Sequence, residues 1–414
     1  MNIIEKLLAK AAGRSVARPG DIVACEVDRA VLLDLQFGDA LGWEEPLRIH
    51  DPSRVSVIMD HAVPAAKIAD AENGTRARNF VARFGIDSFF DVGRHGICHQ
   101  VIAEQGLALP GQMLACTDSH TCAAGAFNCA ARGLGPAEML QILCTGHTWH
   151  VVAPTIRYEL MGEKPRGLSG KDIFLYIAGE YGSAVNHNLE FGGPGLMSLP
   201  INDRRTMATQ GIELNADFTV FPCDEVTDRY LATRTTASYE RMAPDPDAEY
   251  AYYREVQLGD IEPQVARPGT VISNSYPVSQ VAGLRVHQCF VGSCANGQLE
   301  DLAIVAGVLK GRTVSPETRF LVTPASQEVH LEAVRLGYVA TMLEAGAVVT
   351  NSTCGACFGY HMGVIGPGEV CLTASTRNFK GRMGSPEADI YMASPATVAA
   401  SALTGRITNP VEVD

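Results

Sequence analysis

The sequence predicts an α/β fold divided into three domains. Its 414 residues are too many for a single hydrophobic core. Short apolar runs alternate along the chain with helical patterns, and several of these runs lead directly into polar residues. Forty glycines and 22 prolines supply many tight turns, which is typical of α/β enzymes whose sites are built on loops.

Residues 1–150 are expected to form the first domain. Apolar residues at helical spacing predict a helix within residues 1–13, with Asn2 and Glu5 as a capping box. The basic residues of this stretch only faintly resemble a transit peptide, so a structural helix is preferred. The remaining expected elements are strands over 21–27, 55–59, 89–92 and 113–116, a helix over 75–84 and helical segments over 125–146.

Acid–base residues follow three of these expected strands. Asp60 and His61 follow the second strand, His99 lies after the third, and Asp118 and His120 follow the fourth. Ligands of α/β folds collect outside the carboxyl ends of strands, so these residues are candidates for a site. One such cluster alone is more often a loop with satisfied hydrogen bonds. Three clusters favour acid–base chemistry.

Residues 151–275 are expected to form the second domain. A strand is predicted over 155–160, and Ser169 with Asp172 forms a capping box that opens a helix to Tyr181. The glycines and Lys171 in this region resemble a phosphate loop, but the full spacing does not fit one. Glu190 lies in a glycine-rich loop, and residues 222–275 form an acidic segment that connects to the next domain.

Residues 276–414 are expected to form the third domain, a mostly parallel α/β unit whose loops gather on one side. Strands are predicted over 286–291, 319–322, 347–349 and 370–372, with a helix over 299–309. The loop near the last strand contains Arg377 and Arg382, which form either a solvated basic surface or a clamp for a carboxylate.

Three cysteines lie in turn-like sequence in this last domain. Cys294 follows Gly-Ser, and Cys354 and Cys357 stand two residues apart. Together they can form a three-thiolate face, but no fourth protein ligand is apparent. An iron–sulfur cluster, a zinc ion and a redox dithiol all remain open on spacing alone. The other nine cysteines lie in or beside apolar or Ala-rich stretches, as small buried hydrophobic residues do.

Charge and composition exclude several classes of partner. A net charge of −13 and a pI of about 5.3 disfavour nucleic acid and anionic membranes as partners. No apolar run approaches the roughly 20 residues that span a bilayer. Twelve cysteines without a secretory signal indicate reduced thiols and a cytoplasmic location.

The chain resembles the aconitase superfamily over nearly its whole length. Seven motifs occur in the order found in that family. They are Met59-Asp60-His61, Gly96-Ile97-Cys98-His99, Asp118-Ser119-His120-Thr121, Glu190-Phe191-Gly192-Gly193, Gly292-Ser293-Cys294-Ala295-Asn296-Gly297, Cys354-Gly355-Ala356-Cys357 and Arg377-Asn378-Phe379-Lys380-Gly381-Arg382. The length is similar to that of the family's free-standing large subunits.

The resemblance implies three α/β/α domains of the aconitase type, without the C-terminal swivel domain. A separate small subunit would supply that domain and the serine that removes the carbon-bound proton. Cys294, Cys354 and Cys357 would hold one [4Fe–4S] cluster per subunit. The fourth iron would have no protein ligand and would bind water or the substrate as a Lewis acid.

The resemblance also assigns roles to the polar residues. Three carboxylate–imidazole pairs would protonate the leaving hydroxyl and orient water: Asp60–His61, Asp118–His99 and Glu190–His120. Ser119 and Arg377 would contact a substrate carboxylate, with Arg382 in support.

Three positions depart from the family pattern. Ala295 stands where Thr is usual, Thr376 where Asn is usual, and Leu33 where a polar residue usually precedes the acid, here Asp34. Leu33 is expected near the substrate and favours a less polar, substituted malate.

The sequence therefore predicts the large subunit of an iron–sulfur hydro-lyase that acts on a small malate-type 2-hydroxy acid. Another substituted-malate hydratase of the same family is the first alternative. An RNA-binding regulator of the family and a zinc-stabilised structural protein are alternatives from other classes, and the acidic charge disfavours the former.

Overall fold

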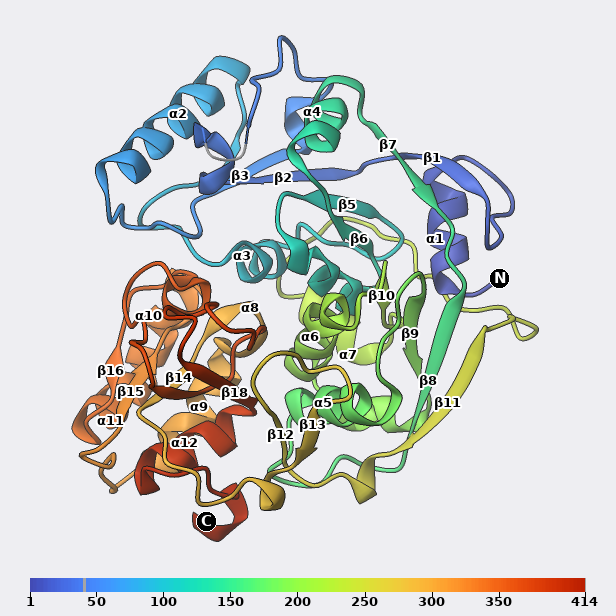
Figure 1. Ribbon diagram of the computed structural model, residues 1–414. Helices are drawn as coiled ribbons and strands as arrows, with labels where there is room; N and C mark the ends of the chain where they lie inside the picture. Colours follow the sequence, from blue (N-terminus) through green and yellow to red (C-terminus); the bar gives the residue numbers. More distant parts are fainter. Residues whose placement is uncertain (40–41, 414) are drawn as a thin grey trace. The chain divides into compact units, whose positions relative to one another are not determined.

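The computed structural model describes residues 1–39 and 42–413, which belong to two compact units (Figure 1). Unit 1 comprises Met1–Gly93, Cys98–Glu163 and Ala184–Gln257. Unit 2 comprises Arg94–Ile97, Lys164–Ser183 and Leu258–Asp414. Within the described residues, no helix combines the length and the apolar character needed to cross a membrane.

A five-stranded, fully parallel sheet forms the first part of unit 1, in the order β4-β3-β2-β5-β6. Its strands are β2 (Arg29–Leu33), β3 (Val55–Ile58), β4 (Ser88–Phe90), β5 (Met113–Cys116) and β6 (Ala130–Gly133). The chain adds strands on one side of β2 and then returns to add β5 on the other. The carboxyl ends of β2 and β5 therefore flank a topological switch point, the usual place for a ligand site in such sheets.

Both faces of this sheet are buried. Ala30 and Leu32 of β2 belong to one hydrophobic cluster, and Val31 and Leu33 belong to another. Side chains alternate along a strand, so each cluster covers one face. The first cluster includes residues of α1 (Ile3–Ala11), α2 (Ile68–Phe84) and α4 (Pro136–Thr145), and the second includes residues of α3 (Cys98–Glu104). Helices on both faces are the normal covering of a parallel sheet.

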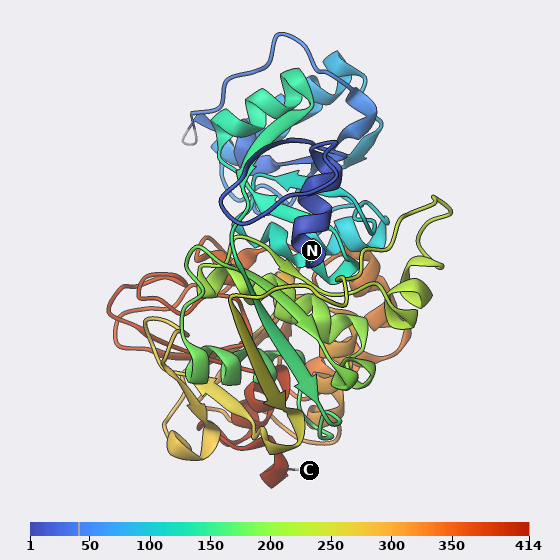
Figure 2. The same cartoon turned by 90° about the vertical axis from the view of Figure 1, so that its right-hand side faces the viewer.

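Unit 1 contains a second parallel sheet, in the order β10-β9-β8-β11. Its long strands β8 and β11 run side by side (Figure 2). The elements are β8 (Thr155–Met161), β9 (Asn188–Gly192), α6 (Ile201–Gln210), β10 (Thr219–Val220), α7 (Glu225–Leu231) and β11 (Tyr252–Gln257). A two-stranded antiparallel ribbon of β1 (Ile22–Glu26) and β7 (His147–Val151) completes the strands of this unit.

Unit 2 is built on a seven-stranded sheet, in the order β13-β12-β18-β17-β14-β15-β16. The five strands from β18 to β16 are parallel, and β12 and β13 are antiparallel at one edge. The strands are β12 (Gln264–Ala266), β13 (Ser275–Pro277), β14 (Gln288–Val291), β15 (Arg319–Val322), β16 (Val348–Val349), β17 (Val370–Thr373) and β18 (Asp389–Ala393). The strand order reverses between β14 and β17, which flank a second switch point.

The helices of unit 2 are α5 (Gly170–Tyr181), α8 (Ser293–Asn296), α9 (Leu299–Leu309), α10 (Gln327–Arg335), α11 (Tyr338–Glu344) and α12 (Pro395–Thr404). The capping box predicted at Ser169 and Asp172 is present at the start of α5. Asp172 is fully buried and also accepts a hydrogen bond from the backbone of Gln264 at 3.1 Å, which ties α5 to β12.

The predicted α/β class is confirmed, but some local predictions differ from the structure. Residues 125–146 were expected to be helical throughout, but Ala130–Gly133 forms β6 and only Pro136–Thr145 forms a helix. Pairing with β5 imposes the strand, although Ala and Gly are poor strand formers. Helix α2 also begins at Ile68, seven residues before the predicted start, because Asp70 accepts hydrogen bonds from the backbone of Ala66 and Lys67.

The division into domains 1–150, 151–275 and 276–414 remains a prediction. The two parallel sheets of unit 1, with strands at 29–133 and 155–257, fall within the first two ranges, but the sheet of unit 2 has strands at 264–393 and so begins in the second range with β12. Helix α5, however, lies in the predicted second domain but packs in unit 2 with β12 and β13.

Candidate functional site

Carboxylates follow three strands of the five-stranded sheet in unit 1. Asp34 follows β2, Asp60 follows β3, and Asp118 lies two residues after β5. Because these strands are parallel neighbours, their carboxyl ends lie on the same edge of the sheet. The switch point predicted from strand order is therefore lined with acids.

Asp34 anchors the loop that carries His61. Its two carboxylate oxygens accept hydrogen bonds from the backbone nitrogens of His61, at 3.1 Å, and Ala62, at 2.7 Å. The sequence predicts a role in substrate contact for the neighbouring Leu33 but no separate role for Asp34. The structure shows that Asp34 fixes the backbone on which the candidate imidazole stands.

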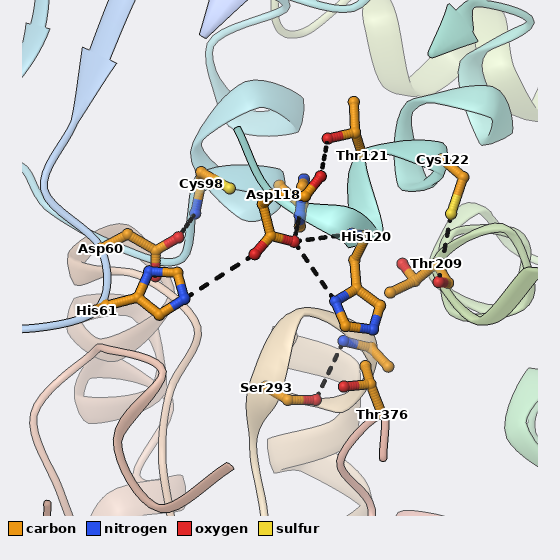
Figure 3. Close-up of polar contacts among 12 residues, drawn as sticks. Asp60, His61, Cys98, Asp118, His120, Thr121, Cys122, Thr209, Ser293 and Thr376 are labelled. Atoms are coloured by element: carbon orange, nitrogen blue, oxygen red, sulfur yellow. Dashed lines mark hydrogen bonds and ion pairs between the residues drawn. The ribbon is translucent and has the colours of Figure 1, made fainter. Parts of the chain in front are cut away.

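Asp60 is almost fully buried and lies beside His61 (Figure 3). Its Oδ2 accepts a hydrogen bond from the backbone nitrogen of Cys98 at 2.9 Å, and its Oδ1 lies 3.6 Å from Nδ1 of His61. Burial raises the pKa of the Asp60 carboxyl, although the neighbouring imidazole of His61 opposes that shift. The predicted contact between Asp60 and His61 is present.

Asp118 is the centre of the cluster. Its Oδ1 lies 2.8 Å from Nε2 of His99, accepts a hydrogen bond from the backbone nitrogen of His120 at 2.8 Å, and lies 3.4 Å from Nδ1 of the same histidine. Its Oδ2 lies 3.9 Å from Nε2 of His61. Burial disfavours the charged carboxylate, but the hydrogen bonds of His120 and His99 outweigh it and hold the pKa of Asp118 well below its usual value. The predicted contact between Asp118 and His99 is present as well.

His120 is held between two carboxylates. Besides Asp118, its Nε2 lies 2.9 Å from Oε1 of Glu213. Burial alone would lower the pKa of His120, but the hydrogen bonds to Asp118 and Glu213 outweigh burial and raise it. An imidazole between two anions keeps its proton to higher pH, which suits a proton donor.

The predicted pairing of His120 with Glu190 is wrong. Glu190 is an internal residue of β9, and its registered neighbour on β8 is Arg157. Its Oε1 accepts hydrogen bonds from Arg157 and from the hydroxyl of Tyr250, each at 2.7 Å, and its Oε2 accepts one from the backbone of Ile3 at 2.8 Å. These three donors account for the position of Glu190, whereas the carboxylate beside His120 comes from the turn after α6.

Glu213 is a candidate site residue that sequence reasoning missed. It lies in a short 3-10 turn, Gly211–Leu214, and only tertiary folding brings that turn to His120. The sequence around it carries no motif, and the tight packing of the turn is visible only in the structure, where a side chain on Gly211 would collide with the hydroxyl of Thr219 on β10. A glycine needed for a close approach two residues before an acid marks a tightly positioned turn.

The three candidate cysteines of unit 2 lie beyond β14 and β16: Cys294 is in the one-turn helix α8, and Cys354 and Cys357 are at a short 3-10 turn, Gly355–Phe358. Cys294, Cys354 and Cys357 are exposed by only 6%, 8% and 2%. Cys294 and Cys354 pack in one small hydrophobic cluster, and the backbone nitrogen of Cys357 donates to the carbonyl of Cys354 at 3.1 Å. Ser293, which directly precedes Cys294, has a positive φ of 79°, a strained conformation for a residue with a side chain.

The surroundings of these thiols fit a soft metal centre. The buried Oγ atoms of Ser352 and Ser375 and Oδ1 of Asn296 have no hydrogen-bond partner among the described residues. Oγ1 of Thr376 and Nη2 of Arg382 each lie 3.9 Å from Sγ of Cys357. Thiolates are the ligands that iron–sulfur clusters and zinc prefer, and the two unsatisfied serine hydroxyls can donate hydrogen bonds to an inorganic group with acceptor atoms.

The other predicted residues have different surroundings. The guanidinium of Arg382 lies over the ring of Phe358, 5.6 Å from its centroid, and supports the Cys354 loop. Ser119 is exposed and Arg377 half-buried. Leu33 is buried against Val31 and other residues of the sheet core, so packing accounts for it, and its contact with substrate remains a prediction.

Comparisons with known proteins give one family. The model of the aconitase family (aconitate hydratase) matches residues 43–282 and 271–405. The chain is 62% identical to a 3-isopropylmalate dehydratase large subunit of Mycolicibacterium smegmatis, over 100% of this chain and 97% of that protein. It is 40% identical to one of Caldanaerobacter subterraneus, over 100% of both chains. It is 39% identical to a probable methanogen homoaconitase large subunit of Methanothermobacter thermautotrophicus, over 99% of this chain and 97% of that protein.

Proposed function

The chain belongs to the aconitase family, as its motifs predicted, and we propose that it is the large subunit of a 3-isopropylmalate dehydratase. In this proposal it carries one [4Fe–4S] cluster and works in the cytoplasm with a separate small subunit, which supplies the serine base. The reaction is a reversible removal and addition of water on a substituted malate. The 62% identity over the whole chain supports this substrate over others of the family.

The observation that carries the proposal is the group of three buried thiols after β14 and β16. Cys294, Cys354 and Cys357 would hold three irons of the cluster. When bound, the cluster would supply a Lewis-acidic iron without a protein ligand. The hydroxyls of Ser352 and Ser375 are suited to donate hydrogen bonds to the cluster's sulfides.

The acid–base residues of unit 1 would manage the protons of the reaction. His120 would carry the proton given to the leaving hydroxyl, since Asp118 and Glu213 both favour its protonated form. Asp118 stays ionised and also orients His99 through Nε2. Asp60, whose pKa is raised, would share a proton with His61 and orient the water that adds back.

The remaining residues would bind the substrate. Ser119 and Arg377 would contact a carboxylate of the malate, and Arg382 would support the loop beside Cys357. Homoaconitase is the second candidate, because a relative with that name is 39% identical over nearly the full length. A dimethylmalate hydratase is a further alternative within the class.

The test is to purify the chain anaerobically with its cognate small subunit and to measure iron, acid-labile sulfide and activity on a panel of malates. The panel contains 3-isopropylmalate, homocitrate, citrate and dimethylmalate. We expect iron and sulfide in near-equal amounts and the highest kcat/KM on 3-isopropylmalate. The large subunit assayed alone should show little activity, because the small subunit would supply the serine base.

Three results would contradict the proposal in distinct ways. Zinc without labile sulfide would exclude the cluster and favour a structural metal site. A preference for homocitrate or dimethylmalate would retain the chemistry and change the substrate. Retardation of RNA in a gel shift at low salt, without hydro-lyase activity, would favour the RNA-binding alternative.

A further inference from the structure

A four-residue segment of unit 2, Arg94–Ile97, is separated in sequence from the rest of that unit. We call it the clip. It lies along the loop between β15 and α10 as a short antiparallel bridge, in which Gly96 pairs with Ser326. The backbone nitrogen of Ile97 donates to the carbonyl of Ala325 at 2.8 Å, and that of Gln327 donates to the carbonyl of His95 at 3.1 Å.

The clip approaches this loop very closely. A Cβ on Gly96 would stand 2.7 Å from Cβ of Ser326 and 2.9 Å from the carbonyl oxygen of Ala325. Both distances are shorter than real side chains tolerate, so only glycine fits here. Gly96 is therefore needed for the contact with the loop between β15 and α10. This need does not depend on His99, three residues later in the same motif.

The side chain of His95 joins the clip to the cysteine loop. Its Nε2 lies 3.1 Å from Nδ2 of Asn351 and 3.4 Å from Nε2 of Gln327. Amide nitrogens only donate, so Nε2 of His95 accepts these bonds and its proton resides on Nδ1. Nε2 of Gln327 also lies 3.4 Å from Oδ1 of Asn351, which closes a triangle of three buried or half-buried side chains. Asn351 stands three residues before Cys354.

The last residue of the clip packs directly on the thiols. Ile97 belongs to the same small hydrophobic cluster as Cys294, Cys354 and Ala325, and Phe358 packs against it. Apolar cover of this kind limits the access of water and dioxygen to a metal centre. The clip therefore contacts the cysteine loop by a hydrogen bond at His95 and by packing at Ile97.

From this geometry we propose that His95 is a positioning residue for cluster retention, acting through Asn351 on the loop of Cys354. The inference rests on the proposed cluster. His95 holds Asn351, Asn351 fixes the start of the loop, and the fixed loop presents Cys354 and Cys357 at constant spacing. Loss of the acceptor at Nε2 lets the loop move and opens the Ile97 cover.

The two decisive variants differ in whether a hydrogen-bond acceptor remains at the position of Nε2 of His95. His95→Gln puts an amide oxygen at the reach of Nε2, whereas His95→Phe keeps the ring and removes the acceptor. Both are purified anaerobically as the complex with the small subunit. The cluster is then followed in air by the decay of visible absorbance and by iron release to a chelator, and the unfolding midpoint is recorded for each variant.

We expect the cluster of His95→Phe to decay about 10-fold faster than that of wild type, in the range seen for residues that support metal ligands. His95→Gln should decay within about twofold of wild type. Asn351→Leu should match His95→Phe, and the double variant should be no worse than either, because both changes break one contact. His330→Gln, a histidine on α10 outside the triangle, is the control and should behave as wild type.

Equal decay in wild type, His95→Phe and Asn351→Leu would overturn the inference. So would equal acceleration in His95→Gln and His95→Phe, because ring packing rather than the acceptor would then matter. Additive effects in the double variant would separate His95 from Asn351 and also count against it. If wild type itself contains no iron and sulfide, the proposed function fails instead, and the absence of any decay signal distinguishes that outcome.

Discussion

The five-stranded sheet of unit 1 and the parallel part of the sheet in unit 2 share one strand order. In unit 1 the order is β4-β3-β2-β5-β6, and in unit 2 it is β16-β15-β14-β17-β18. Strand β2 thus corresponds to β14, β3 to β15 and β5 to β17. Each sheet has its switch point between the first and fourth strands of its chain order.

The residues that follow equivalent strands are chemically different. Asp34 follows β2, whereas Gly-Ser-Cys294 follows β14. Asp118 follows β5, whereas the segment of Thr376 follows β17. The same backbone device therefore positions carboxylates and imidazoles in one unit and thiols and hydroxyls in the other. Topology decides where a site forms, and the side chains after the strands decide its chemistry.

The contrast extends to cysteines within one unit. Burial raises the pKa of the thiol of Cys371, a residue inside β17, to about 12, and it raises that of Cys289 inside β14 well above its usual value. Such thiols stay protonated and inert. In unit 2 the cysteines beyond the strand ends are the ones placed to act as ligands, which separates Cys294, Cys354 and Cys357 from Cys289 and Cys371.

The largest expected effect comes from Cys354→Ser, which removes a thiolate from the edge of unit 2. Visible absorbance of the cluster and activity should both be lost, a decrease of well over about 10²-fold, because even partners of ligands cost 10–100-fold. Absorbance spectra and assays of the complex give the measurement. Cys371→Ser is the matched control and should keep its absorbance. If Cys354→Ser kept its absorbance and its activity, the three cysteines would not form the metal site.

Glu213→Gln tests the acid–base residues of unit 1 with a nearly isosteric change. We expect kcat to fall by about 10²–10⁴-fold, as for loss of a general acid–base contribution. The charge of Glu213 raises the pKa of His120, so its removal lowers that pKa. Protonated His120 is then lost at lower pH, and the alkaline limb of the kcat profile should shift toward acid.

Measurement of kcat against pH in both proteins shows whether that shift occurs. An equal fall in kcat at every pH, with the limb unmoved, would mean that His120 does not supply the proton. The cluster absorbance of Glu213→Gln serves as the internal control. This absorbance should stay at the wild-type level, because the change lies among the acid–base residues and not among the thiols.

Sequence patterns located part of both groups of candidate residues, because several of these residues come shortly after a strand. Asp60, Asp118 and Cys294 are adjacent to short buried strands whose apolar runs are visible in the sequence. Glu213 has no such signal, because it is carried to His120 by the packing of α6 and the turn after it. The resemblance points to Glu190 because Glu190 lies in a family motif, but its side chain is fixed by Arg157 across the β8–β9 pair.

The order of the strands in the two sheets could not be predicted from the sequence either. The pattern predicted mostly parallel strands with loops on one side, but it did not give the shared order of the two sheets. The prediction of helix over 125–146 failed for the same reason. Strand β6 exists because β5 offers it a partner, and its composition of Ala, Arg and Gly carries no β signal.

Glu190→Gln separates the contribution of Glu190 to stability from any contribution to catalysis. The change weakens a buried ion pair with Arg157, so we expect a loss of about 3 kcal/mol in unfolding free energy. In the folded complex kcat should remain near the wild-type value. Urea unfolding followed by fluorescence measures the first quantity, and assays at low temperature measure the second.

Glu26→Gln is the matched control, since Glu26 pairs with Arg54 at the exposed surface of the same unit. Its cost should be below about 1 kcal/mol. A large fall in kcat of Glu190→Gln, with stability unchanged, would restore the catalytic role that the sequence predicted for Glu190.

The smallest expected effects come from a pair of threonines at equivalent strand ends. Thr121 lies beyond β5, and its hydroxyl donates to the carbonyl oxygen of Asp118 at 2.5 Å. Thr376 lies beyond β17, and its hydroxyl is 3.9 Å from Sγ of Cys357. A short O–H···O bond is stronger than a contact to sulfur, so Thr121→Val should cost about 1 kcal/mol and Thr376→Val only a few tenths. Urea midpoints rank the two, while Thr376→Val alone should shift the visible spectrum of the cluster. If Thr121→Val shifted that spectrum instead, it would be wrong to assign the acid–base chemistry to unit 1 and the thiolate chemistry to unit 2.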